Sequence, residues 1–218
     1  MDADSRKIPS HEVTYARLRD MILFGHLAPG APVTIQGLIA DLGAGMTPVR
    51  EAIRRLTAEG ALLPQGNRRV AVPELSAELL DQVAFARLAI EPRLAALAAP
   101  RLTSAAIDRL EAIDAAVSRA IDAGKLPDYL AANHTFHFAI YEAASAPVLL
   151  DLARSLWLRA GPSLRAVIDR YGRESAPDLH REAIAAMRAG DAAALADAIK
   201  RDIQQGVDHV RQALRETA

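Results

Sequence analysis

The feature that most constrains this chain is a helical hydrophobic pattern that fills its C-terminal two thirds. From Ser76 onward, Ala, Leu, Ile and Val recur at the three- and four-residue spacing of amphipathic helices. Short connections between such helices favour antiparallel packing in a bundle. The connections lie at Pro100, Gly124, Pro147, Gly172 and Gly190. We therefore predict six helices, over residues 76–98, 103–123, 127–144, 147–170, 176–189 and 191–215.

The composition fits a helical fold and excludes several kinds of chemistry. Of the 218 residues, 51% are hydrophobic but only 4% are aromatic, which favours helices that pack closely through small side chains. The sequence contains no cysteine, so disulfides, thiolate metal sites and cysteine nucleophiles are excluded. Residues 1–10 lack the features of a signal peptide, and no run of 18 apolar residues follows. We expect a cytoplasmic protein with no membrane partner.

The first 73 residues predict three short helices followed by a β-hairpin. The helices cover residues 12–24, 35–42 and a segment that starts between 45 and 48 and stops at Gly60. A loop over residues 26–33 separates the first two helices. The hairpin pairs residues 61–64 with 69–72 around a turn at 65–68. A helix-turn-helix followed by a hairpin is the shape of a winged DNA-binding domain.

The predicted fold is therefore mainly α, with two domains. Residues 1–73 would form an N-terminal winged helix-turn-helix with a small β-hairpin wing. Residues 74–218 would form a C-terminal antiparallel six-helix bundle, and the interior of a bundle is where helical proteins build ligand and metal sites.

Charge is distributed unevenly between these two parts. The whole chain has a formal net charge of −1, but residues 1–73 carry nine Lys/Arg against seven Asp/Glu. Arginines concentrate on the third helix and on the hairpin, which suits a phosphate backbone; a solvated face without a partner is the alternative. The candidate DNA-binding arginines are Arg50, Arg54, Arg55, Arg68 and Arg69.

Two segments of this N-terminal part carry a family resemblance. Residues 15–22 read Tyr-Ala-Arg-Leu-Arg-Asp-Met-Ile, and residues 47–52 read Thr-Pro-Val-Arg-Glu-Ala. The chain resembles the GntR family of winged-helix regulators, which implies operator binding by a homodimer. Thr47 and Arg50 match the family pattern and are implied to contact phosphate or base edges.

The sequence departs from the family pattern at several positions of the predicted DNA-binding surface. Gly45 and Met46 stand where the family usually has Ser-Arg, and Gln36 stands near a common arginine. Arg69 takes a position where the family tends to place glycine. We therefore expect Gln36 and Met46 to face an operator that differs from the family's usual sequence.

The C-terminal part resembles the FadR-type, or FCD, effector domain of these regulators. The resemblance rests on residues 87–91, Arg-Leu-Ala-Ile-Glu, on Phe136-His137, and on residues 178–184, Asp-Leu-His-Arg-Glu-Ala-Ile. Six helices in place of seven would put it nearer the VanR-like branch. The resemblance implies dimerisation, a small carboxylic-acid or sugar-acid effector, and often a divalent metal held by one Asp and three His.

Carried over residue by residue, that metal site becomes Asn133, His137, His180 and Asp202. Asn133 replaces the family's Asp, and Asp202 replaces its third His, so the net ligand charge is unchanged. Zinc, nickel or manganese accepts two imidazoles, one carboxylate and one amide oxygen. The alternative is a metal-free polar pocket in which these four side chains hydrogen-bond the effector.

Other polar residues of the bundle are candidates for effector binding. Arg87 would pair with an effector carboxylate, or simply with Glu91 one turn later. Asn133, Tyr141 and Arg159 are further pocket candidates. His134 is expected on a flanking face, and Trp157 in the core.

The sequence thus favours a DNA-binding transcription regulator with effector-controlled operator affinity, and we expect it to be a repressor. One alternative is a helical-bundle metalloenzyme that uses a metal-bound water. Its support is the two histidines alone, since no His-Glu-x-x-His, phosphate-binding glycine loop or Gly-x-Ser-x-Gly motif occurs. A second alternative is an interaction module without effector control, which would have no fillable pocket.

Overall fold

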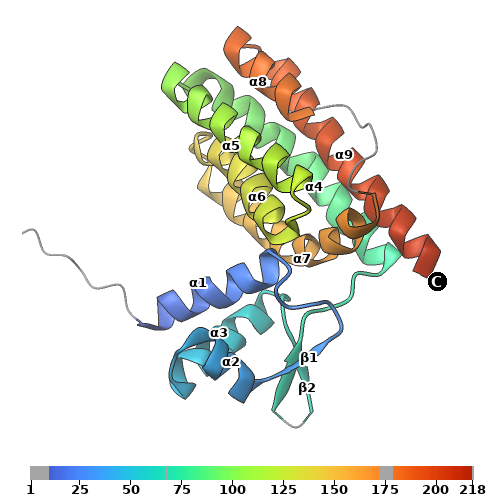
Figure 1. The fold of residues 1–218 in the computed structure, drawn as a ribbon. Helices are drawn as coiled ribbons and strands as arrows, with labels where there is room; N and C mark the ends of the chain where they lie inside the picture. Colours follow the sequence, from blue (N-terminus) through green and yellow to red (C-terminus); the bar gives the residue numbers. More distant parts are fainter. Residues whose placement is uncertain (1–9, 67, 172–178, 218) are drawn as a thin grey trace, which may run out of the picture.

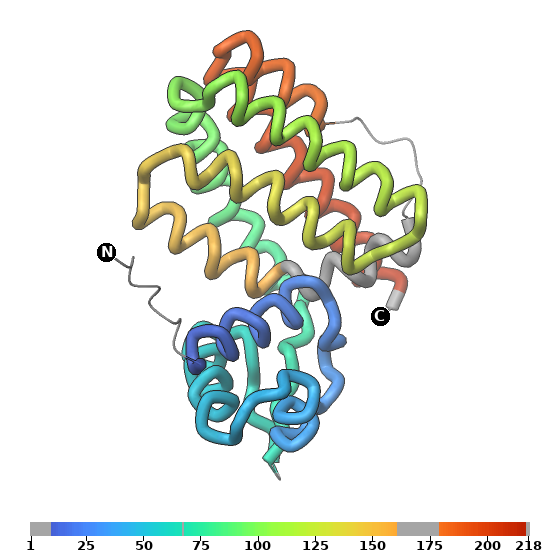
Figure 2. Tube along the Cα trace, turned by 60° about the vertical axis from the view of Figure 1, so that its left-hand side comes forward, coloured from blue at the N-terminus to red at the C-terminus, as the bar shows by residue number. Residues whose placement is uncertain are grey.

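The computed structural model describes residues 10–66, 68–171 and 179–217, and their side chains outside 161–171 and 217. It has the predicted mainly α architecture, with a small winged unit at one end of a helical bundle (Figures 1 and 2). The winged unit contains α1 (Ser10–Leu23), β1 (Pro32–Thr34), α2 (Ile35–Leu42), α3 (Met46–Ala58), β2 (Leu63–Gln65) and β3 (Arg69–Ala71).

The three helices of the winged unit pack around one apolar core. Its fully buried side chains include Leu18 and Ile22 of α1, Leu38 of α2 and Leu56 of α3. The ends of α2 are well defined, because the Thr34 hydroxyl accepts a hydrogen bond from the amide of residue 37 at 2.9 Å and Gly43 closes the helix in the left-handed conformation. The predicted short turn between α2 and α3 is therefore present.

The wing is a three-stranded antiparallel sheet in the order β1-β3-β2. The predicted hairpin is β2 and β3, but the prediction of a loop over residues 26–33 was wrong at its end. Residues 32–34 form β1, in which Val33 lies opposite Val70 of β3. A three-residue strand is too short to show an alternating pattern in the sequence. Only its pairing with a distant strand defines it.

The bundle contains α4 (Ala77–Ala98), a short 3₁₀ helix (Ala99–Arg101), α5 (Ser104–Asp122), α6 (Leu126–Glu142), α7 (Pro147–Tyr171), α8 (Leu179–Ala189) and α9 (Ala192–Thr217). Each α-helix matches a predicted one to within a few residues, and the predicted start at residue 176 lies outside the described residues. The Ser76 hydroxyl caps α4 by accepting from the amide of Leu79. None of the described helices is long and apolar enough to cross a membrane.

Helix packing in the bundle brings distant segments together. Helix α4 lies along α9, α5 lies along α6, and α8 packs on both α5 and α9 (Figures 1 and 2). The core side chains on these helices are mainly Leu, Ile and Ala. The alanines among them are small enough to let the helix axes approach closely, as the composition suggested. Consequently α6, α8 and α9 converge on the same part of the interior.

The winged unit contacts the bundle through α1, which lies against α7 (Figure 1). At this contact the His134 ring of α6 stacks on Phe138 at 4.3 Å between centroids. The edges of Phe24 and Trp157 meet the same imidazole at 5.8 and 5.4 Å. His134 is therefore a contact between the two units.

A second contact joins α7 to the end of α3. Gly60 follows α3 with φ +76°, and a side chain at this position would bring its Cβ to 3.0 Å from the Arg159 guanidinium carbon. The left-handed backbone favours glycine at this position, whereas the exposed Arg159 guanidinium is the end of a flexible side chain and could move aside.

The pKa of His134 predicts a pH dependence of stability. Burial, followed by the charge of Arg19, lowers the pKa of His134 from 6.5 to about 4. Between these pH values the unfolded chain binds the extra proton, so stability falls as the pH falls. His134→Phe keeps an aromatic ring but cannot titrate. From pH 7 to pH 4.5, the wild type should lose about 2 kcal/mol more than this variant in urea unfolding. Parallel losses in the two proteins would contradict the assignment.

Candidate functional site

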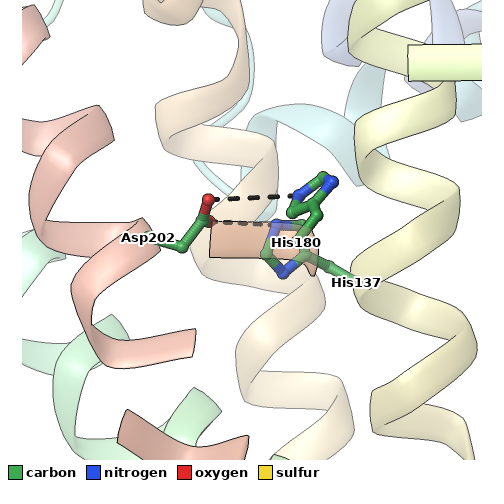
Figure 3. A group of neighbouring side chains, drawn as sticks. All are labelled: His137, His180 and Asp202. Atoms are coloured by element: carbon green, nitrogen blue, oxygen red, sulfur yellow. Dashed lines mark ion pairs between the residues drawn. The ribbon is translucent and has the colours of Figure 1, made fainter. Parts of the chain in front are cut away.

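Three potential metal ligands from three different helices meet inside the bundle. They are His137 of α6, His180 of α8 and Asp202 of α9, and Figure 3 shows both imidazoles turned toward the carboxylate. His137 Nε2 lies 3.1 Å from Asp202 Oδ2, and His180 Nε2 lies 4.0 Å from Asp202 Oδ1. All three ligand atoms fall within 4.8 Å of one another. The structure therefore brings together three of the four residues predicted to hold a metal.

The position of each ligand follows from its helix. His137 lies on the buried side of α6, between Phe136 and Phe138, and is only 1% exposed. His180 is the second residue of α8, whose apolar face packs on α9. Asp202 lies three and four residues after Ile199 and Ala198 on α9, both of which are buried in the core. The carboxylate is therefore a polar group on an otherwise apolar helix face.

His180 is oriented by a carboxylate on a fourth helix. Its Nδ1 lies 2.8 Å from Oδ1 of Asp114 on α5, and both side chains are largely buried. An ionised carboxylate can only accept a hydrogen bond, so Nδ1 carries the proton. Nε2, on the Asp202 side of the ring, then has a free lone pair.

His137 is oriented by a longer chain of hydrogen bonds. The Tyr141 hydroxyl donates to Glu91 Oε2 at 2.7 Å, so its oxygen is available to accept from His137 Nδ1 at 3.1 Å. His137 Nε2 is buried and has no hydrogen-bond partner among the described residues, because Asp202 lies close to it but off the hydrogen-bond direction. A buried polar atom without a partner needs an explanation, and a bound cation is one.

The residues present fit a divalent cation. Ligand atoms about 2.0–2.2 Å from an ion lie roughly 3–3.5 Å from one another. The 3.1 Å between His137 and Asp202 falls in this range, and His180, at 4.0 Å from Asp202, would move slightly closer on binding an ion. Burial tends to raise the pKa of Asp202, whereas the positive charge of Arg87 lowers it and favours the ionised carboxylate. Two neutral imidazoles and one carboxylate suit zinc, nickel or manganese and leave positions open.

Asn133, the predicted fourth ligand, lies one turn before His137 on α6 and is buried. It shares the helix face of that histidine, as its spacing predicted. Its role as a ligand stays a prediction. Tyr129, also on α6, was not singled out from the sequence. Burial and the charge of Asp202 raise the pKa of its phenol.

Arg87 forms a salt bridge with Glu91. This pairing was the sequence-based alternative to a contact with the effector. Arg87 Nε lies 2.6 Å and Nη2 lies 3.2 Å from the two carboxylate oxygens, and both side chains are buried. Glu91 Oε2 also accepts from Trp157 Nε1 at 3.0 Å and from Tyr141. The guanidinium lies over the Trp157 ring at 4.6 Å. Arg87 and Tyr141 therefore take part in an internal network, and their predicted contact with an effector stays a prediction.

Arg159 does not lie where its predicted role requires. It is exposed and packs on Gly60 at the end of α3. Arg159 was predicted among the polar groups of the pocket, but helical phase turns it away from the buried face that carries Trp157 and Leu158.

The predicted DNA-binding residues all lie on the surface of the winged unit. Exposed positions on α2, α3 and the wing are Gln36, Met46, Thr47, Arg50, Arg54, Arg55, Arg68 and Arg69. Arg54 pairs with Glu51 on its own helix. Arg55 lies 3.7 Å over the Tyr15 ring and pairs with Glu12 and Glu59. Arg55 therefore ties α3 to α1, which the sequence did not indicate.

Asp114 is the main site residue that the sequence analysis missed. A signal for it exists, because Asp114 continues the buried face of α5 marked by Ile107, Leu110 and Val117. A carboxylate in such a row is expected to have a buried partner. Nothing in the sequence identifies that partner as His180, which lies 66 residues further along the chain.

Comparison with known protein families shows to which family this chain belongs. Residues 11–72 match the model of the bacterial regulatory proteins of the gntR family, and residues 82–205 match the FCD domain. The chain belongs to the GntR family. It is a transcription regulator with an FCD effector-binding domain, and not an enzyme, so the metalloenzyme alternative is not favoured.

Relatives of this GntR regulator support the same conclusion. The chain is 29% identical over 194 residues to the HTH-type transcriptional regulator McbR of Escherichia coli, covering 87% of each protein. It is 30% identical over 195 residues to a probable D-xylose utilization operon transcriptional repressor of Paenarthrobacter nicotinovorans, covering 88% of this chain and 85% of that one. The solved structure of E. coli McbR/YncC has a TM-score of 0.88 at 26% identity, covering 94% and 99% of the two chains.

The buried pair of Arg87 and Glu91 predicts a large stability effect. Glu91→Ala would leave the Arg87 guanidinium buried without a counter-charge, which costs about 3–5 kcal/mol. Urea unfolding should show this loss. The matched control is Glu142→Ala, which removes an exposed carboxylate paired with Arg154 and should cost at most about 1 kcal/mol. Equal losses in the two variants would disprove the importance of the buried network.

Proposed function

We propose that this GntR regulator is a dimeric repressor whose operator affinity is controlled by a small carboxylic or sugar acid bound in the FCD domain beside a divalent metal. The observation that carries the proposal is the convergence of His137, His180 and Asp202 within 4.8 Å. Imidazole nitrogens and a carboxylate are costly to bury in an apolar core without a partner. A bound cation would be such a partner. Open positions on such a cation suit a carboxylate or hydroxyl of an acid.

In this proposal, DNA binding and effector binding belong to different domains, which are separated by the predicted boundary after residue 73. Residues 1–73 would read the operator, with the N-terminal end of α3 in the major groove and the wing against the backbone or minor groove. Residues 74–218 would bind the effector and hold the dimer together, so that two α3 helices reach half-sites about one DNA turn apart. The P. nicotinovorans relative is described as a probable repressor, which supports the same direction of control.

Effector control needs a physical path from the site to α3, and the two contacts between the units supply it. His134 follows Asn133 directly on α6 and touches Phe24 at the end of the first helical segment. Trp157 contacts Glu91 from α7, and Arg159 on the same helix packs on Gly60. An effector that binds the two arrangements with affinities differing by about 1–3 kcal/mol would change operator affinity correspondingly.

The DNA-binding assignment is tested at Arg50. It lies exposed near the start of α3. Arg50→Ala should weaken binding to an operator duplex, selected with the wild-type protein, by roughly 5- to 150-fold. Fluorescence anisotropy measures this change. Arg109→Ala, an exposed arginine of α5, is the control and should bind like the wild type; unchanged affinity in the Arg50 variant would remove this residue from the interface.

The metal assignment is tested by the metal content of gently purified protein. Native mass spectrometry with elemental analysis should find about one divalent ion per chain, lost in Asp202→Ala because a ligand is missing. Asp197→Ala removes an exposed carboxylate of the same helix and should keep the ion. If the wild type holds no ion after supplementation with zinc, nickel and manganese, these side chains form a metal-free hydrogen-bonding pocket instead.

A further inference from the structure

The strongest unassigned feature of the molecule is the carboxylate behind His180. Asp114 comes from α5, which supplies none of the candidate ligands, yet its Oδ1 lies 2.8 Å from His180 Nδ1. Its side chain is 15% exposed and that of His180 is 9% exposed. The contact is therefore a largely buried, charge-assisted hydrogen bond on the side of the ring away from Asp202.

Two neighbours fix different properties of the His180 ring. Phe136 stacks on it with centroids 3.9 Å apart and planes 17° apart, which fixes the plane of the imidazole. Stacking alone would equally allow the His180 ring to be rotated by half a turn in χ2, which would move both ring nitrogens to the opposite side. Asp114 makes that distinction, because its carboxylate selects Nδ1–H and leaves Nε2 as the lone-pair nitrogen. Nε2 is the atom that lies 4.0 Å from Asp202.

A purely structural role, joining α5 to α8, does not account well for this pair. Arg188 of α8 already joins these helices by contacting Asp108 and Glu111 of α5. Those contacts lie near the surface and need no buried carboxylate. A buried carboxylate has a desolvation cost, so its place behind a candidate ligand indicates a function in the site.

We propose that Asp114 is a positioning residue of the metal site: it holds His180 in the tautomer and ring orientation that present Nε2 as a ligand. This inference rests on the proposed metal-binding function. A carboxylate bonded to the outer nitrogen of a ligating histidine also makes the inner nitrogen more basic, and loss of such a partner typically lowers metal affinity 10- to 100-fold. His137 has a different partner, the neutral Tyr141 hydroxyl.

The first measurement is zinc affinity by competition with a chromogenic chelator. Asp114→Asn has nearly the same shape without the charge and should bind zinc 10- to 100-fold more weakly than the wild type. Asp114→Glu restores the carboxylate and should recover part of the loss. Asp122→Asn, an exposed carboxylate of the same helix, should have no effect. Thermal unfolding of each metal-free variant checks that the fold is retained.

The second measurement is independent of metal. In the metal-free protein at pH 8, the nitrogen-15 NMR signals of the His180 ring report which nitrogen carries the proton. The wild type should show Nδ1–H, and Asp114→Asn should shift the population toward Nε2–H. A merely structural contact would lower stability in the Asn variant without lowering zinc affinity below that of the Asp122 control.

The outcomes separate this inference from the proposed function. Weaker zinc binding together with the tautomer change supports it. Unchanged zinc affinity in a folded Asp114→Asn protein, or Nε2–H already in the wild type, overturns it. If the wild type binds no zinc, the metal part of the proposed function fails and the positioning of a metal ligand fails with it, even where the NMR signals show that Asp114 still selects the tautomer.

Discussion

The packing of α4, α6 and α7 depends on the hydrogen bonds that the buried Glu91 carboxylate accepts. It is fully buried and accepts hydrogen bonds from Arg87, Tyr141 and Trp157, which belong to α4, α6 and α7. Removing a carboxylate from water costs several kcal/mol, so the three helices must hold their donors in place to recover that energy. The position of His137 follows from the same requirement, because the Tyr141 hydroxyl that Glu91 orients also meets its Nδ1.

Most of the fold could be predicted from the sequence because long helices repeat their pattern over many residues. All six bundle helices and the three helices of the winged unit were found in this way. Strand β1 was missed because it has three residues and is defined by pairing with β3. Periodicity reports the local environment of a segment, whereas strand pairing depends on a partner far away in the chain.

The candidate site was predicted less completely, for a related reason. His137, His180 and Asp202 were identified by resemblance, and the structure brings them together. The contacts between helices that support them were not predictable, since Asp114 reaches His180, and Glu91 reaches Tyr141 and Trp157, across helices that the sequence does not order in space. Arg159 was misplaced because a helix that passes the core also has a second face, and one residue of phase decides which face a side chain occupies.

Gly60 has a consequence for how the two parts of this regulator can be exchanged. The Arg159 guanidinium occupies the space that any side chain at residue 60 would need. Because this guanidinium is the exposed end of a flexible side chain, it can move aside, and the lasting constraint at residue 60 is its φ of +76°. A chimaera that joins this bundle to the winged unit of another regulator should therefore keep glycine at the position after the helix that corresponds to α3. Residue 159 can then differ between the two parents, because its contact with the winged unit adapts to the new partner.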